Sequence, residues 1–162
     1  MKKILYLSLF LLCLNISFGQ IMSLKDLLKI NQITFDEFHT YARQKKYKFY
    51  QVEDDENISG FSYAYGQSKS NKYATRVLTK YQYKKNKKHA VLYQTLTSGD
   101  YFNFNNQLAG LKFQFIHSRL SKAGTNFLIY RKGNIEVSLT TDQGYDSNGS
   151  KIPYYQVLVS GY

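Results

Sequence analysis

Residues 73–83 alternate between two kinds of side chain. The odd positions carry residues that favour strands, whereas the even positions include cations; the two sets are Tyr73, Thr75, Val77, Thr79, Tyr81 and Tyr83, against Arg76, Lys80 and Lys84. Because successive side chains of a strand point to opposite faces, this period of two predicts a strand with one aromatic and one cationic face. Aromatic residues make up 17% of the chain, and strands are enriched in them, so we expect several such strands.

Helix signals precede two groups of predicted strands. Two residue pairs have capping-box spacing, in which side chains satisfy the free amides of a first helical turn: Ser23 with Asp26, and Thr34 with Glu37. They predict helices near 24–30 and 35–46. A third helix is predicted from Thr97 and Asp100 to Gly110, since glycine accepts the left-handed conformation of a helix C-terminus. Alternation and turn residues predict strands near 47–53, 60–66, 72–83, 89–96, 111–118, 125–131, 134–141 and 153–160.

These elements predict one α+β domain over residues 20–162, with helices packed on one face of a mostly antiparallel sheet. The two halves of the domain are similar in sequence at two offsets. An offset of 64 aligns Tyr47-Lys48-Phe49 with Leu111-Lys112-Phe113, Gly60 with Gly124, Tyr63 with Phe127 and Tyr65 with Ile129; an offset of 66 aligns Phe35 and Phe38 with Tyr101 and Phe104, and Val91-Leu92 with Val157-Leu158. We therefore expect two similar helix-plus-four-strand units, 35–96 and 97–160, with chance similarity as the alternative.

The predicted order of elements resembles the tandem helix-plus-four-strand architecture of the β-lactamase inhibitory proteins. This resemblance implies an α+β fold and brings no motif with it, so it implies no functional residue in this chain. The N-terminal layout and the Lys-, Asn- and Tyr-rich composition also resemble the uncharacterised small exported proteins of Bacteroidota. That second resemblance implies no particular activity.

Residues 1–19 have the layout of a secretory signal peptide. A cationic start, Met1-Lys2-Lys3, precedes an apolar run at 4–14 and small residues near Gly19, which is the order that signal peptidase substrates share. The apolar run is shorter than the ~20 residues that span a bilayer. We expect cleavage before Gln20 and an exported protein, periplasmic or secreted. Cleavage removes Cys13, the single cysteine, so no disulfide is expected.

No sequence pattern indicates a cofactor, a metal or a catalytic centre. The three histidines, His39, His89 and His117, lack metal-ligand spacing, and no phosphate-binding glycine loop occurs. The acidic run 53–56 and the polar segment 142–149 lack the spaced ligands of a calcium loop, so we interpret both as turns. A hydrolase would need His39 or His117 paired with a carboxylate by folding, and the sequence supports an enzyme less well than a binding protein.

Positive charge is concentrated around residues 84–89, in a chain of formal net charge +11. The candidate residues for an anionic partner are Arg76, Lys80, Lys84, Lys85, Lys87 and Lys88, with Arg76 and Lys80 expected to extend a patch centred on the turn. For an exported protein the expected partners are an acidic protein, an anionic polysaccharide or an envelope surface rather than nucleic acid. The alternative is a solvated turn that prevents edge-to-edge association.

The function best supported by the sequence is that of a non-catalytic binding or interaction module. Such a module would recognise a protein or a glycan through its tyrosine-rich sheet face or its basic turn, because tyrosine suits binding surfaces. Two alternatives remain open. One is a small secreted hydrolase with a histidine–carboxylate site, and the other is a structural envelope protein whose aromatic residues all lie in the core.

Overall fold

The computed structural model describes residues 21–66, 74–121, 124–145 and 149–161. The predicted signal peptide lies outside these residues, as do Tyr73 and residues 146–148 of the polar segment. Within the described residues the chain forms three helices and eight strands: α2 (Leu24–Gln32), α3 (Phe35–Gln44), β1 (Lys48–Asp54), β2 (Ile58–Tyr65), β3 (Arg76–Tyr83), β4 (His89–Thr95), α4 (Ser98–Gly110), β5 (Gln114–Leu120), β6 (Asn126–Lys132), β7 (Ile135–Tyr145) and β8 (Lys151–Gly161).

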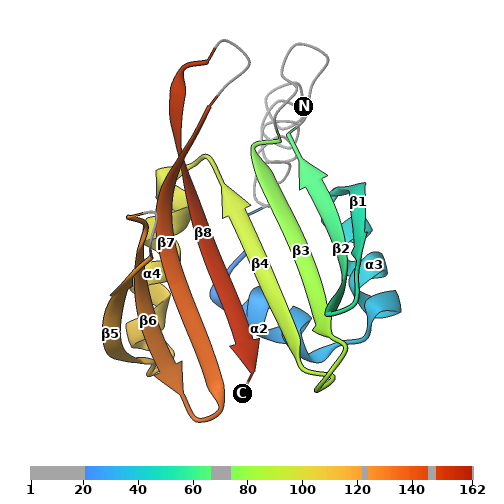
Figure 1. The fold of residues 1–162 in the computed structure, drawn as a ribbon, viewed down its shortest axis with the longest axis horizontal. Helices are drawn as coiled ribbons and strands as arrows, with labels where there is room; N and C mark the ends of the chain where they lie inside the picture. The colour runs from blue at the N-terminus through green and yellow to red at the C-terminus, as the bar shows by residue number, and fades with distance from the viewer. Residues whose placement is uncertain (1–20, 67–73, 122–123, 146–148, 162) are drawn as a thin grey trace, which may run out of the picture.

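The strands form one antiparallel sheet in the order β1-β2-β3-β4-β8-β7-β6-β5, and the three helices lie behind it in the view of Figure 1. The predicted α+β class, with helices on one face of an antiparallel sheet, is confirmed. No described helix is long and apolar enough to cross a membrane.

The first two helices begin where the capping boxes predict. Asp26 N donates to Ser23 Oγ at 3.1 Å, and the Asp26 carboxylate accepts from Ser23 N at 2.9 Å. Thr34 and Glu37 make the same reciprocal pair of bonds at the start of α3. These bonds satisfy amides that have no partner inside the helix.

The core fills the space between the helices and the covered face of the sheet. Leu24, Leu27 and Ile30 of α2 are fully buried there, as is Phe38 of α3. The ring of Phe38 packs edge-on against Tyr63 of β2, with centroids 5.5 Å apart. Burial of apolar surface at this interface, about 25 cal/mol per Å², fixes which face the helices cover.

The two halves of the structure share local features that lie 66 residues apart. A bulge interrupts β1 between Phe49 and Gln51, and another interrupts β5 between Phe115 and His117. The residue after each helix C-cap, Lys46 in one half and Lys112 in the other, has a positive φ of 62° and 61°. The offset of 64 does not relate these features. The left-handed residue after α4 is Lys112 rather than Gly110, which still belongs to the helix.

The sheet is strongly curled. Ile58 of β2 and Arg119 of β5 line the same cavity, although six inter-strand spacings separate these strands in the sheet order. In a flat sheet that separation is roughly 29 Å, at about 4.8 Å a spacing. Curling explains why Ser62, Thr79 and Ser138, which point away from the helices, are nevertheless buried. The face without helices is therefore concave.

Candidate functional site

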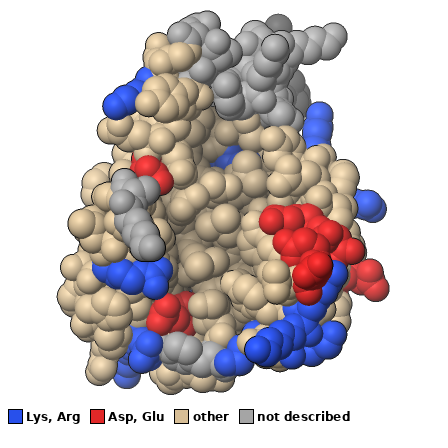
Figure 2. Space-filling view, viewed as in Figure 1, with Lys and Arg blue, Asp and Glu red and all other residues tan. Residues whose placement is uncertain are grey.

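Two adjoining cavities lie on the concave face, which is the hollowed surface that Figure 2 shows. The larger, here the Tyr81 cavity, has a volume of about 350 Å³ and is lined by residues that include Ile58, Tyr81, Leu92, Phe127, Ser138 and Gln156. The smaller, the Tyr145 cavity, has a volume of about 260 Å³ and is lined by residues that include Tyr50, Val77, Gln94, Tyr145, Ile152 and Tyr154. Gln94 of one cavity is paired in register with Gln156 of the other, across the β4–β8 seam. The two cavities thus follow one another along the middle of the face.

One wall of the Tyr81 cavity depends on a glycine. Glu53, Gly60 and Tyr81 stand in one row across β1, β2 and β3. A Cβ atom at Gly60 would lie 2.6 Å from Cδ1 of Tyr81, so the tyrosine ring crosses β2 in the space that any other residue would fill. Burial raises the pKa of Tyr81, and the charge of Glu53 raises it further. The ring therefore extends from β3 across β2 toward Glu53 of β1.

The opposite wall combines an aromatic ring and a cation. The guanidinium carbon of Arg119 lies 5.2 Å from the centroid of the Phe127 ring, within the distance of a cation–π contact. Nearby, Arg131 Nη2 donates to Glu136 Oε2 at 3.0 Å. The side chains of one half of the chain therefore face Tyr81, which belongs to the other half.

The floor of the Tyr81 cavity carries short polar side chains. Ser138 and Thr140 belong to its lining, whereas Ser62 and Thr79 are buried outside the lining and form a hydrogen bond between their hydroxyls at 2.8 Å. Ser138 is only 6% exposed, and its Oγ has no hydrogen-bond partner within the described part of the chain. An unsatisfied buried hydroxyl costs about 1–3 kcal/mol, so such groups are rare and often belong to a functional site.

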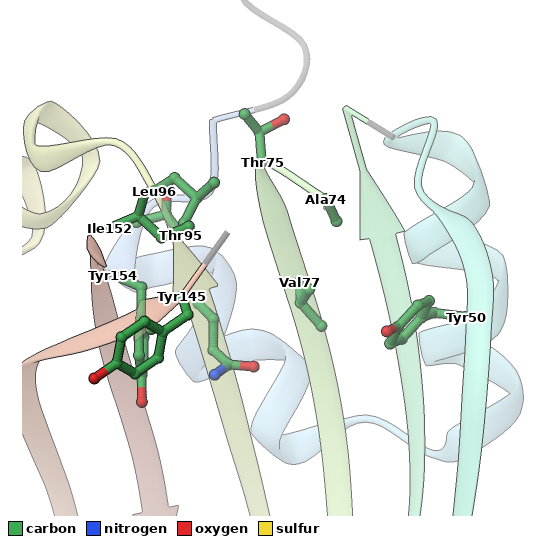
Figure 3. Close-up of a pocket in the computed structure, with 11 residues that line it drawn as sticks. Tyr50, Ala74, Thr75, Val77, Thr95, Leu96, Tyr145, Ile152 and Tyr154 are labelled. Carbon is green, nitrogen blue, oxygen red and sulfur yellow. The ribbon is translucent and has the colours of Figure 1, made fainter. Parts of the chain in front are cut away.

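The Tyr145 cavity is bounded by aromatic rings from strands of both halves of the sheet, β1 on one side and β7 and β8 on the other. Figure 3 shows Tyr145 and Tyr154 on one side and Tyr50 on the other, with Val77 between them. Tyr154 OH donates to Asp142 Oδ2 at 3.2 Å, and the Thr125 hydroxyl donates to the same atom at 3.2 Å. Hydrogen bonds from the Gln143 amide and from these two hydroxyls hold the pKa of Asp142 below its ordinary value. Asp142 thus fixes the orientation of the Tyr154 ring.

The basic turn lies beside the acidic run, a neighbourhood that the sequence does not predict. Lys84 Nζ is 2.8 Å from Asp54 Oδ1, and Lys84 N donates to Asn57 O at 2.8 Å. The hydrogen bonds from Lys84 and Ser59 hold the pKa of Asp54 below its ordinary value. Three of the candidate lysines, Lys85, Lys87 and Lys88, are exposed. Figure 2 shows the resulting contact between a positive and a negative group of side chains.

The expectation that Lys80 and Arg76 extend a surface patch is not met. Lys80 is fully buried, and its Nζ donates to Ile30 O at 2.7 Å and to Asn31 O at 3.3 Å, both at the end of α2. Arg76 Nε donates to Asp100 Oδ2 at 2.7 Å. The alternation of β3 correctly separates the two faces of this strand. The helices cover the cationic face, however, and leave the aromatic one open.

Each of the three histidines has different surroundings. His39 Nδ1 lies 2.8 Å from Tyr63 OH, and His89 Nδ1 lies 3.1 Å from Lys80 Nζ. His117 is exposed on the edge strand β5. The described residues contain no group of three His, Cys, Asp or Glu side chains placed to hold a metal ion. The acidic run covers the last two residues of β1 and the start of the turn to β2, where the Asp55 carboxylate accepts from the amides of Asn57 and Ile58.

Sequence reasoning missed the residues that shape the Tyr81 cavity. The offset of 64 aligns Gly60 with Gly124, yet Gly60 underlies Tyr81 in β2, whereas Gly124 has a positive φ of 85° outside the strands. A glycine inside a strand pattern is itself a signal that a neighbour approaches closely, so Gly60 carries a signal for this wall of the cavity. No sequence signal marks Ser138 as a residue of the cavity, because its place there depends on the curl of the sheet.

Comparison with known proteins provides no further assignment for this site. No family model, curated protein or solved structure matches the chain. The function of the site therefore has to be argued from the geometry of the concave face.

Proposed function

We propose that this chain is an exported, non-catalytic binding module whose binding site is the concave face of the sheet. The observation that carries the proposal is the pair of adjoining cavities on that face, with aromatic rings on their walls and short polar groups on their floor. Concave sites that combine apolar walls with a few polar groups are typical of ligand binding. Export is supported by the layout of residues 1–19.

Two repeated units are part of this proposal. The bulges and helix ends that lie 66 residues apart support it, as does the direct pairing of Leu92 with Leu158, which are themselves 66 residues apart. Two duplicated units related by an approximate two-fold axis at the β4–β8 seam would give this pairing. A site on this seam takes one wall from each unit, so duplication and curling together create a cavity that a single unit lacks.

The proposal predicts where a ligand contacts the protein. We expect the amide NMR signals of Leu92, Ser138 and Leu158 to shift when the labelled chain is titrated with the native envelope's polysaccharide fraction or with its protein fraction. Signals from the outer surface of α4, such as that of Asn103, are expected to stay unchanged. Shifts confined to the helix side, or none with either fraction, would contradict the proposal.

The basic turn provides a separate prediction. We propose that Lys85, Lys87 and Lys88 contribute to retention on an anionic surface, because they are exposed and adjacent. Their triple replacement by Ser is expected to lower the salt concentration at which the chain elutes from heparin, since fewer counterions are released on binding. The control replaces Lys25, Lys48 and Lys151, which are exposed at scattered positions, and so has the same net charge. Equal elution of the two variants would show that the turn acts only through total charge.

A further inference from the structure

We infer that the Tyr81 cavity binds one pyranose ring of a neutral oligosaccharide, with the face of the sugar on the Tyr81 ring and one of its hydroxyls on Ser138. This inference rests on the proposed binding function and names the chemical class of the ligand. Three features of the cavity support it: the position of the tyrosine ring, the unpartnered hydroxyl and the balance of charge.

The Tyr81 ring lines the cavity from above Gly60 of the neighbouring strand. Because Gly60 has no side chain, the ring lies across β2 instead of standing up from the sheet. The face of an aromatic ring carries negative potential and attracts the weakly positive C–H groups on one side of a pyranose. The absence of a side chain at Gly60 thus leaves the Tyr81 ring as the apolar surface on which a flat ligand would stack.

The Ser138 hydroxyl becomes available as a hydrogen-bond partner when its side chain rotates toward the cavity, because Oγ itself is buried. It is buried, lines the Tyr81 cavity and has no partner within the described residues. Thr140 and Gln156 line the same floor. Hydroxyl and amide groups both donate and accept hydrogen bonds, as sugar hydroxyls do, so the two sets can satisfy each other. A ligand hydroxyl at Ser138 would remove the cost of leaving Oγ unsatisfied.

The charge of the cavity favours a neutral ligand. Its lining contains one cation, Arg119, and one carboxylate, Glu136, and Arg119 lies on the Phe127 ring. The acidic run of β1 ends beside the same face, with Glu53 in register with Gly60. An anionic sugar would meet these carboxylates. The adjoining Tyr145 cavity extends the site along the seam, which suits a linear chain of several sugar units.

The experiment is a binding assay of the full chain on an array of neutral and carboxylated oligosaccharides of four to six units. We expect neutral members to bind, with affinity reduced about tenfold in Tyr81→Ala and about fivefold in Ser138→Ala. Gly60→Ala keeps the tyrosine but tilts its ring, and we expect it to weaken binding as Tyr81→Ala does. Phe102→Ala is the matched control, because Phe102 is 61% exposed on α4, away from the cavity, and its affinity should equal that of the wild type.

Thermal unfolding separates a binding role of Ser138 from a structural one. Removal of an unsatisfied buried hydroxyl is expected to leave the midpoint of Ser138→Ala unchanged or raised while affinity falls. A lowered midpoint with unchanged affinity would overturn the role of Ser138.

Three outcomes of the array would overturn the sugar inference: no neutral oligosaccharide bound, only carboxylated members bound, or equal binding by Tyr81→Ala and the wild type. If the envelope protein fraction still shifts the signals of Leu92 and Leu158, the concave face binds a protein and the proposed function stands. If neither fraction shifts them, both proposals fail.

Discussion

Replacement of Asp100 by Ala is expected to lower the free energy of unfolding by about 3–5 kcal/mol, because it breaks a buried ion pair. Asp100 is 4% exposed. Its carboxylate accepts hydrogen bonds from Arg76 Nε at 2.7 Å, from Tyr93 OH at 2.9 Å and from Thr95 Oγ1 at 3.0 Å. The substitution leaves the Arg76 guanidinium, whose side chain is 15% exposed, without this counter-charge. A loss of this size is a large part of the roughly 5–15 kcal/mol that stabilises a domain.

The pH dependence of stability gives an independent check on Asp100. Burial alone would raise the pKa of the Asp100 carboxyl. The hydrogen bond and charge of Arg76, together with hydrogen bonds from Tyr93 and Thr95, instead hold this pKa below the ordinary 3.8. The stabilisation is therefore fully present above pH 3.8 and is lost as the pH falls below that value. Urea unfolding of the wild type and of Asp100→Ala at several pH values measures both the loss of stability and its dependence on pH.

A double variant is the control for the Asp100 prediction. Arg76→Met combined with Asp100→Leu removes both charges, and we expect it to recover much of the stability that Asp100→Ala loses. Two results would contradict the assignment of a coupled pair. One is a loss of unfolding free energy below 1 kcal/mol in Asp100→Ala, and the other is a loss in the double variant equal to the sum of the losses in the two single variants.

The fold could be predicted because its signals are local. The capping boxes at Ser23 and Thr34 satisfy amides within four residues, and the period of two along β3 follows from the geometry of any strand. These signals place the helices and strands without knowledge of the tertiary structure. They also predict correctly that Val77 and Lys80 lie on opposite faces.

The assignment of each face could not be predicted, because it depends on long-range packing. Charge favours an exposed Lys80, yet the helices cover its face, since Leu78 and Tyr63 beside it are apolar and form the core. The cation is accommodated by the carbonyl groups at the end of α2. A charge pattern on a strand therefore indicates alternation but not which side meets water.

The candidate site depends on the curvature of the sheet, which no local pattern encodes. Tyr81 and Phe127 belong to different halves and approach one cavity only because the β4–β8 seam joins two curled meanders. The sequence did favour a tyrosine-rich sheet face as a binding surface. It gave no means of selecting Tyr81 from the 16 tyrosines, apart from the glycine that precedes Phe61 in β2.

Lys80 produces the second large expected effect, an increase in stability at alkaline pH. Its Nζ is enclosed by the carbonyls of Ile30 and Asn31 and by His89, with the Phe35 ring centroid 5.9 Å away. Burial lowers the pKa of Lys80 from 10.5 to about 8, against the opposing charge of Glu37. Burial and the charge of Lys80 likewise lower the pKa of His89, so the imidazole is neutral at pH 7 and its Nδ1 accepts from the ammonium.

The sign of the effect follows from proton binding by the two states. Between pH 8 and 10.5 the unfolded chain retains a proton on Lys80 that the folded chain has lost, so a rise in pH favours the folded state. From pH 7 to pH 10 the free energy of unfolding of the wild type should rise by about 2–3 kcal/mol relative to Lys80→Met. Other titrating groups, including the tyrosines, are common to both proteins and cancel in the difference.

Urea unfolding at pH 7, 8, 9 and 10 measures this difference directly. Lys25→Met, which removes an exposed lysine of α2, is the matched control, and its stability should run parallel to that of the wild type over the same range. A constant difference between the wild type and Lys80→Met would show that Lys80 keeps its proton in the folded chain. In that case the carbonyls at the end of α2 would stabilise the Lys80 ammonium to the same extent as bulk water does. The lowered pKa instead requires that these few acceptors compensate only part of the lost hydration, which is the expected result for a cation enclosed by one helix end and a neutral histidine.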